Sequence, residues 1–210
     1  MMRTLGGVRV VGAEGLVPIS DLKRAKLTHY FRAMDVTGDG LIREADYLAA
    51  ADRVISVLEM DPESGDAQAL KAGYERLWKT IEQADADGDH AVTVDEWVDL
   101  HYRLSLDTEQ FEAVIVERGQ VIIRIFDRDH DDRISLDDWQ LFFRTIGFSE
   151  ENFETAFRKL DRNANGYLTV DEIVSAGREF FASDDPDAPG NWLYGDYTGE
   201  LNVSDPVAAP

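Results

Sequence analysis

The chain of 210 residues is long enough for one or two domains with apolar cores, and 44% of it is hydrophobic, which predicts a folded globular protein. Its 42 acidic residues against 21 basic ones give a formal net charge of −21, which would repel the phosphates of nucleic acid. The absence of cysteine excludes disulfides, zinc–thiolate sites and thiol catalysis, and no apolar run is long enough to span a bilayer.

Residues 1–19 are expected to form a flexible N-terminus. Arg9 and Glu14 interrupt their apolar side chains, so the segment lacks the continuous apolar stretch of a signal peptide. Together with the absence of cysteine, this predicts a cytoplasmic protein.

From residue 20 onward, one acidic pattern occurs four times, in twelve-residue windows that begin at residues 35, 85, 127 and 161. Each window carries oxygen-bearing side chains at positions 1, 3, 5 and 12, and the backbone carbonyl at position 7 is a further candidate ligand. A hard divalent cation takes about six to eight oxygen ligands, and this spacing can wrap one loop around it. The candidate ligands, window by window, are Asp35, Thr37, Asp39, Leu41 and Asp46; Asp85, Asp87, Asp89, Ala91 and Glu96; Asp127, Asp129, Asp131, Arg133 and Asp138; and Asp161, Asn163, Asn165, Tyr167 and Glu172.

Each window lies between two segments with apolar residues at helical spacing. The residue directly after position 12 is bulky and apolar in every copy: Tyr47, Trp97, Trp139 and Ile173. Thr93 with Glu96, and Thr169 with Glu172, match the capping-box pattern that starts a helix. Each repeat is therefore predicted to be a helix, a loop and a helix, and the two glutamates are expected both to cap a helix and to bind metal.

The four windows differ at position 6, which usually requires a positive φ. Glycine meets that need in the first and fourth windows, at Gly40 and Gly166. The second and third windows have His90 and Asp132, which belong to the few residue types enriched at positive φ. We expect these two windows to be strained and still functional, and the fourth to be a strong site.

The first window is predicted to be the weakest site. Thr37 replaces an acid at position 3, and Arg43 occupies position 9. Asp46 and Asp138, which close the first and third windows, are one methylene shorter than glutamate and favour coordination through one oxygen. Mg²⁺ is therefore expected to compete at the first and third windows.

The windows start 50, 42 and 34 residues apart, two close with aspartate, and a tail segment follows at residues 187–192. In these features the chain resembles the sarcoplasmic calcium-binding proteins of the EF-hand family, and their bacterial calerythrin-like members most of all. The resemblance covers about residues 20–200. It implies an all-α protein, in which two pairs of EF-hand helix–loop–helix units pack into a compact two-lobed molecule. It also implies an intracellular Ca²⁺ buffer with up to four sites.

Position 8 of each window is β-branched or leucine. In an EF-hand, this residue forms a short antiparallel pairing with its counterpart in the neighbouring loop. We therefore expect Ile42 beside Val92, and Ile134 beside Leu168.

The N-terminal EF-hand pair is expected at residues 20–106 and the C-terminal pair at residues 107–182, with a new helix starting at Asp107 or Thr108. No long exposed charged helix is expected between the two pairs. Within the first pair, Pro62 is predicted to lie in the first turn of a helix.

Residues 183–210 are expected to form a C-terminal tail. Trp192, Tyr194 and Tyr197 favour a tail that docks its aromatic rings between the lobes, whereas a frayed end is the alternative.

The first alternative to a buffer is a calcium sensor that exposes a groove to a target protein. Sensors of this kind use a Met-rich groove, whereas this chain has four methionines and carries rings such as Trp97, Phe143 and Phe180 on its predicted inner faces. We favour a monomeric buffer, and the sequence identifies no protein target.

A less favoured alternative is a small-molecule-binding protein of the coelenterazine type, from the same structural superfamily. The predicted last helix, residues 171–182, contains no histidine, and the four histidines of the chain are interpreted as packing or surface residues. No phosphate-binding glycine loop, zinc-binding histidine motif or serine nucleophile elbow occurs, so the chain is not expected to be an enzyme.

Overall fold

The computed structural model describes residues 19–148 and 151–202, so residues 1–18 of the expected flexible N-terminus and residues 203–210 of the tail lie outside the described residues. The described part of the chain is mostly helical, as predicted, and none of its helices has both the length and the apolar character needed to cross a membrane. With η marking 3₁₀-helices, the elements are α1 (Asp21–Met34), β1 (Leu41–Ile42), α2 (Glu44–Val57), α3 (Gly65–Ile81), η1 (Glu82–Ala84), β2 (Val92–Thr93), α4 (Val94–Leu106), α5 (Thr108–Phe126), β3 (Arg133–Ile134), α6 (Leu136–Ile146), α7 (Phe153–Leu160), β4 (Leu168–Thr169), α8 (Val170–Ala182), η2 (Pro189–Trp192) and η3 (Thr198–Asn202).

Side-chain caps set where several helices begin. Helices α1, α3 and α5 follow Ser20, Ser64 and Asp107, whose side chains accept hydrogen bonds from N–H groups of the first turn. The predicted start of α5 is therefore confirmed. The prediction for Pro62 was wrong, because the Ser64 cap places the start of α3 at Gly65 and leaves Pro62 in the preceding turn.

The helices that leave three of the loops begin with a capping box that contains a hydroxyl side chain. Those of α4 and α8 use Thr93 with Glu96 and Thr169 with Glu172, as predicted. Helix α6 has a third box, in which Ser135 pairs with an aspartate instead of the usual glutamate or glutamine. In each box, the carboxylate that closes the loop also binds the backbone at the helix start.

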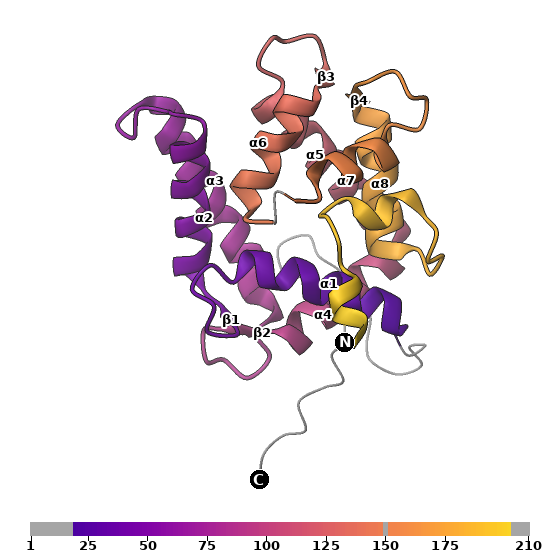
Figure 1. Cartoon of the computed structure of the whole chain (residues 1–210). Coiled ribbons are helices and arrows are strands. Elements are labelled where there is room, and N and C mark those ends of the chain that lie inside the picture. The colour runs from indigo at the N-terminus through magenta and orange to yellow at the C-terminus, as the bar shows by residue number, and fades with distance from the viewer. Residues whose placement is uncertain (1–18, 149–150, 203–210) are drawn as a thin grey trace.

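The four loops associate in two pairs through short antiparallel strands. Strand β1 pairs with β2, with Ile42 opposite Val92, and β3 pairs with β4, with Ile134 opposite Leu168. Both predicted pairings are therefore confirmed. All four side chains are fully buried, and Figure 1 shows the two strand pairs at opposite ends of the molecule.

The two halves of the chain share one apolar interior. Helices α1 and α4 pack against α8, and α2 packs against α6. Large aromatic side chains fill this interior, and Trp97, Trp139, Phe143 and Phe180 have no exposed surface. Because these rings belong to both halves, the interior cannot be divided into two independent cores.

Two glycines allow α5 and α8 to approach closely. A Cβ atom at Gly119 would lie 2.6 Å from Val174 Cγ2, and one at Gly177 would lie 2.9 Å from Ile115 Cγ2. Such distances are shorter than van der Waals contact, so a side chain at either position would force the helices apart.

The segment after α8 packs against elements of both halves, and Figure 1 shows η3 in yellow beside α1. The Tyr194 ring stacks on Tyr30 of α1, with centroids 4.5 Å apart and planes inclined by 7°. It also meets the edge of Phe180 of α8 at 4.8 Å. On α1, His29 Nε2 lies 2.9 Å from the Tyr194 carbonyl oxygen.

A buried lysine ties the same segment to α1 and α8. Lys26 Nζ donates hydrogen bonds to the carbonyls of Glu179 and Ser183, each at 2.9 Å, and to Asn191 Oδ1 at 2.8 Å. The two carbonyls belong to the C-terminal end of α8, where a cation is favourable. One side chain of α1 thus joins the end of α8 to η2.

Replacing Gly190 tests this packing. A Cβ atom at Gly190 would lie 2.5 Å from the Ala176 carbonyl oxygen and 2.6 Å from Glu179 Cβ. Gly190→Ala is therefore expected to lower the free energy of unfolding by about 1–3 kcal/mol in urea denaturation. Gly199→Ala is the matched control, because a Cβ atom there meets nothing within 4 Å, and its effect should stay within about 0.5 kcal/mol. Equal unfolding midpoints for the two variants would contradict the packing of η2 on α8.

Candidate metal centres

The predicted ligands come together where an incoming helix meets an outgoing one, in loops one to four (residues 35–46, 85–96, 127–138 and 161–172). Position 1 follows α1, η1, α5 or α7, and position 12 lies in the first turn of α2, α4, α6 or α8. In loops two and three, carboxylate oxygens from positions 1, 3 and 5 lie within 4.8 Å of one another: Asp85, Asp87 and Asp89; Asp127, Asp129 and Asp131. A divalent cation would neutralise this convergent negative charge.

The loop backbone holds the position-1 carboxylate in place. In every loop this carboxylate accepts a hydrogen bond from the N–H of position 6, at 2.8 Å in loops one and four and at 2.9 Å in loops two and three. For Asp85 and Asp127, burial would raise the pKa, but bonds of this kind outweigh it and the pKa is lowered. These carboxylates are therefore held in the charged form that a cation requires.

In loop three, the neighbouring carboxylates make ionisation of Asp129 less favourable. Burial, followed by the negative charges of Asp131 and Asp127, raises the pKa of the Asp129 carboxyl. A bound cation would reverse the effect of the two neighbouring charges, because it attracts all three carboxylates.

Positive φ angles shape the loops at position 6, as predicted. The angles are +82° at Gly40, +64° at His90, +63° at Asp132 and +84° at Gly166. Position 4 also has positive φ in every loop, which was not predicted: Gly38, Gly88, His130 and Ala164. Each non-glycine residue in this region costs about 1–2 kcal/mol. Loop four therefore carries strain at Ala164 even though its position 6 is glycine.

The closing carboxylate contacts both the loop and the next helix. Glu172 Oε2 accepts hydrogen bonds from the Thr169 N–H and hydroxyl at 3.0 and 2.9 Å, while its Oε1 accepts one from Asn163 Nδ2 at 3.0 Å. Glu96 divides its oxygens in the same way, between Thr93 and the Ala86 N–H. One oxygen thus serves the helix cap, and the other faces the loop.

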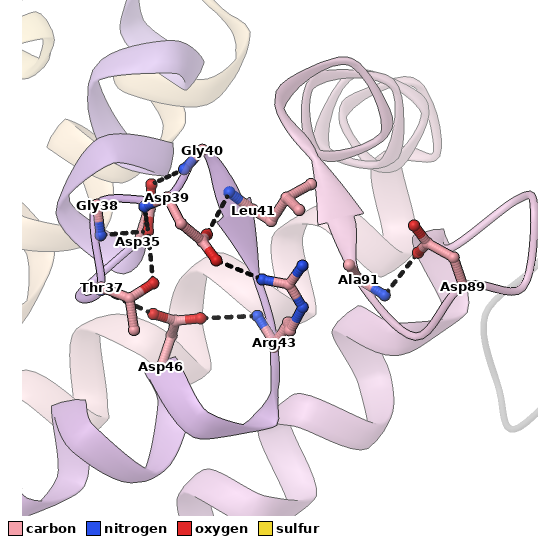
Figure 2. Close-up of polar contacts among 10 residues, drawn as sticks. All are labelled: Asp35, Thr37, Gly38, Asp39, Gly40, Leu41, Arg43, Asp46, Asp89 and Ala91. Atoms are coloured by element: carbon pink, nitrogen blue, oxygen red, sulfur yellow. Dashed lines mark hydrogen bonds and ion pairs between the residues drawn. The ribbon is translucent and has the colours of Figure 1, made fainter.

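The position-7 residues, proposed from the sequence as carbonyl ligands, lie at the starts of the strands. Leu41 and Arg133 begin β1 and β3, whereas Ala91 and Tyr167 directly precede β2 and β4. The N–H groups of Leu41, Ala91 and Tyr167 donate to the position-5 side chains at 3.0, 2.8 and 2.9 Å. Figure 2 shows the first two of these bonds. They hold the backbone of position 7 close to the position-5 ligand.

Two arginines contact candidate ligands directly. Arg43 Nη1 lies 2.6 Å from Asp39 Oδ2 in loop one, as Figure 2 shows, and Arg128 Nε lies 2.8 Å from Asp138 Oδ1 in loop three. Arg43 was identified from the sequence at position 9, whereas the contact of Arg128 with a ligand was not predicted. The only indication of the Arg128 contact in the sequence is a basic residue at position 2. That indication is not sufficient to predict the contact, because Arg162 at the same position of loop four pairs with Glu179 instead.

The loops differ in how well they fit a divalent cation. Loops two and three place three carboxylates together, and loop four places Asp161 with two amide oxygens and the carboxylate of Glu172. Loop one has the hydroxyl of Thr37 at position 3, and its Asp39 is already paired with Arg43. The residues of loops two to four therefore fit calcium better than those of loop one.

Comparisons with known proteins also indicate helix–loop–helix calcium-binding units. A family model described as "EF hand" matches residues 153–175, which run from α7 through loop four into α8. Clytin from Clytia gregaria is 30% identical over 173 residues, covering 80% of this chain and 85% of clytin. Calerythrin from Saccharopolyspora erythraea is 23% identical over 158 residues, covering 74% of this chain and 89% of calerythrin. Among solved structures, the calcium-loaded apo form of the coelenterazine-binding protein from Renilla muelleri has a TM-score of 0.63 at 25% identity, covering 85% of this chain and 99% of that one.

These similarities extend far beyond the one matched helix–loop–helix unit. The relatives are calcium-binding EF-hand proteins, and the comparisons point to no catalytic family. The chain therefore belongs to the EF-hand calcium-binding proteins, the family that also includes calerythrin and the sarcoplasmic calcium-binding proteins.

Proposed function

We propose that this protein is a monomeric calcium buffer of the cytoplasm, without enzymatic activity, that takes up as many as four calcium ions. The clustered loop carboxylates carry the proposal, because they supply the oxygen ligands that calcium prefers. Bound calcium would neutralise charge in a chain whose net charge is −21. The absence of cysteine supports a reducing compartment.

We propose residues of all four loops as the ligands of these sites. Side chains at positions 1, 3, 5 and 12 and the carbonyl at position 7 would hold each ion. Loops one and three close with aspartate, at Asp46 and Asp138, so magnesium would compete there.

A buffer is favoured over a sensor because the aromatic faces of the helices are already covered. A sensor exposes a Met-rich groove when calcium binds. Here, Tyr194 packs among rings from α1, α6 and α8, including Tyr30, Phe142 and Phe180. Large apolar side chains that remain exposed in the described residues are scattered over separate elements: Leu77, Leu106, Leu136, Tyr167 and Leu201. Such a surface offers no continuous groove to a target helix.

Dense packing also weighs against a coelenterazine-type ligand, although clytin and the coelenterazine-binding protein are relatives. The interior cavity between α5, α8 and Tyr194 measures about 10 Å³, whereas a pocket for a drug-sized ligand has about 300–1,000 Å³. A second hollow, of about 410 Å³, lies open beside loop three and is lined by Asp127, His130 and Asp132, so it is not an enclosed interior site. Gly119 and Gly177 keep α5 and α8 too close together for a larger space in this structure.

His101 is a packing residue in this interior. Its ring stacks on Phe181, with centroids 5.7 Å apart, and its Nδ1 lies 2.9 Å from the Trp97 carbonyl oxygen. Burial, followed by the positive charge of Arg118, lowers the pKa of His101 to about 3, so the ring is neutral at physiological pH. A neutral histidine with a backbone partner supports the interpretation of this residue as structural.

Replacing the closing glutamates tests the metal sites. Glu96→Gln and Glu172→Gln should each weaken calcium binding at one site by at least about tenfold, because the amide lacks the second charged oxygen. Glutamine can keep the capping box, so the helix starts are retained. Calcium titration by calorimetry, at fixed magnesium, measures both the number of sites and their affinities.

The controls remove the same charge one residue earlier. Asp95→Asn and Asp171→Asn, at position 11, should change the affinity by less than about threefold, because such exposed charges are screened. Equal losses in test and control variants would contradict the ligand assignment. Fewer than two calcium ions bound by the unaltered protein would overturn the proposed function.

Binding of an apolar fluorescent dye separates a buffer from a sensor. Calcium should leave the dye signal unchanged or lower it, because the aromatic interior is covered and calcium relieves charge repulsion. The measurement compares the protein in chelator with the protein in saturating calcium. A large calcium-induced rise in fluorescence would instead establish a sensor.

A further inference from the structure

Arg43 lies where the other three loops have a hydroxyl side chain. Position 9 is Thr93, Ser135 or Thr169 in loops two to four, and each of these hydroxyls caps the outgoing helix. Arg43 makes no such cap, and its guanidinium is directed at Asp39, at position 5 of the same loop (Figure 2).

Both oxygens of the position-5 carboxylate have a partner within loop one. Asp39 Oδ2 lies 2.6 Å from Arg43 Nη1, and Asp39 Oδ1 accepts the Leu41 N–H at 3.0 Å. The closing Asp46, which is only 1% exposed, accepts the N–H groups of Thr37 and Arg43 at 3.0 and 2.9 Å. Loop one therefore satisfies its carboxylates with groups of its own.

In loop three, the arginine that contacts a candidate ligand lies at position 2. Arg128 Nε, from position 2, lies 2.8 Å from Asp138 Oδ1, and Asp138 Oδ2 accepts the Ser135 hydroxyl at 2.6 Å. The Asp138 side chain is 8% exposed. Both oxygens of the carboxylate that closes loop three are thus engaged, one of them by a cation.

In loops two and four, no arginine contacts the position-5 or position-12 side chain among the described residues. Position 2 of loop two is Ala86, and Arg162 at position 2 of loop four pairs with Glu179 of α8 at 2.7 Å. Their closing carboxylates, Glu96 and Glu172, accept hydrogen bonds from neutral groups. The strands β1–β2 and β3–β4 join one loop of each kind.

We propose that Arg43 and Arg128 are built-in counter-ions that calcium must displace, so that loops two and four fill first and loops one and three fill at higher calcium. The proposal rests on the proposed function, because it assumes that the loops bind calcium. Each EF-hand pair then contains one loop that is ordered by its own arginine and one that depends on the metal. The buffer consequently responds over two ranges of calcium concentration.

Substitution by the residues found in the other loops tests the proposal. In a Glu96→Gln/Glu172→Gln background, loops two and four are weakened, and the backbone amide NMR signals of loops one and three identify the calcium that binds there. Arg43→Thr and Arg128→Ala should then each raise the calcium affinity of one remaining site by about tenfold, since a cation is removed and a carboxylate is released. Isothermal titration calorimetry gives the two affinities.

Arg162→Ala, in the otherwise unaltered protein, is the matched control. It removes the same charge from position 2 of loop four, where the arginine pairs outside the loop, and should change the affinity of the tighter sites by less than about threefold. An equal gain in this control would assign the effect to net charge and overturn the proposal. Unchanged or weaker binding in both test variants would also overturn it, whereas failure of loops two and four to bind calcium in the unaltered protein would instead overturn the proposed function.

A second readout requires no calcium. In chelator, Arg43→Thr should accelerate backbone hydrogen exchange in β1 and β2 by about tenfold, because loop one loses its own counter-ion. Arg162→Ala should leave exchange in β3 and β4 within about twofold of the unaltered protein. Equal exchange in β1 and β2 with and without Arg43 would contradict its ordering role.

Discussion

The carboxylate at position 12 of each loop joins the start of the outgoing helix to the first part of the loop. One of its oxygens accepts a hydrogen bond from the residue at position 9, where the outgoing helix begins. Its other oxygen faces the loop and meets Thr37, Ala86, Arg128 or Asn163. A ligand of this kind couples the metal site to the orientation of a helix, because the same side chain serves both.

That coupling extends directly into the core. The residue after each closing carboxylate is buried, and Trp97 and Trp139 have no exposed surface. Helices from the two halves pack against each other around these rings, and Tyr194 fills a space that α1, α6 and α8 all line. The loops therefore sit on one continuous interior, which favours a compact buffer over a protein whose lobes open separately.

Local rules allowed much of the fold and of the site to be predicted. The loop positions and the Thr93 and Thr169 capping boxes follow from spacings of twelve residues or fewer, whereas the strand pairs were predicted from the resemblance to EF-hand proteins. The positive φ at His90 and Asp132 follows from the same repeat, because position 6 of such a loop usually requires a positive φ. The error at Pro62 arose because a proline favours several turn positions, and the Ser64 cap decided between them.

The sequence by itself determined which residues lie in each loop and which oxygens they offer, because those properties depend on neighbours along the chain. Only the tertiary structure decided which cation meets which carboxylate: Arg128 reaches Asp138, while Arg162, at the same loop position, reaches Glu179 of α8. It also decided how α5 and α8 close on each other through Gly119 and Gly177, and where Tyr194 packs. Long side chains and distant segments have several partners within reach, and the packing of helices far apart in sequence selects among them.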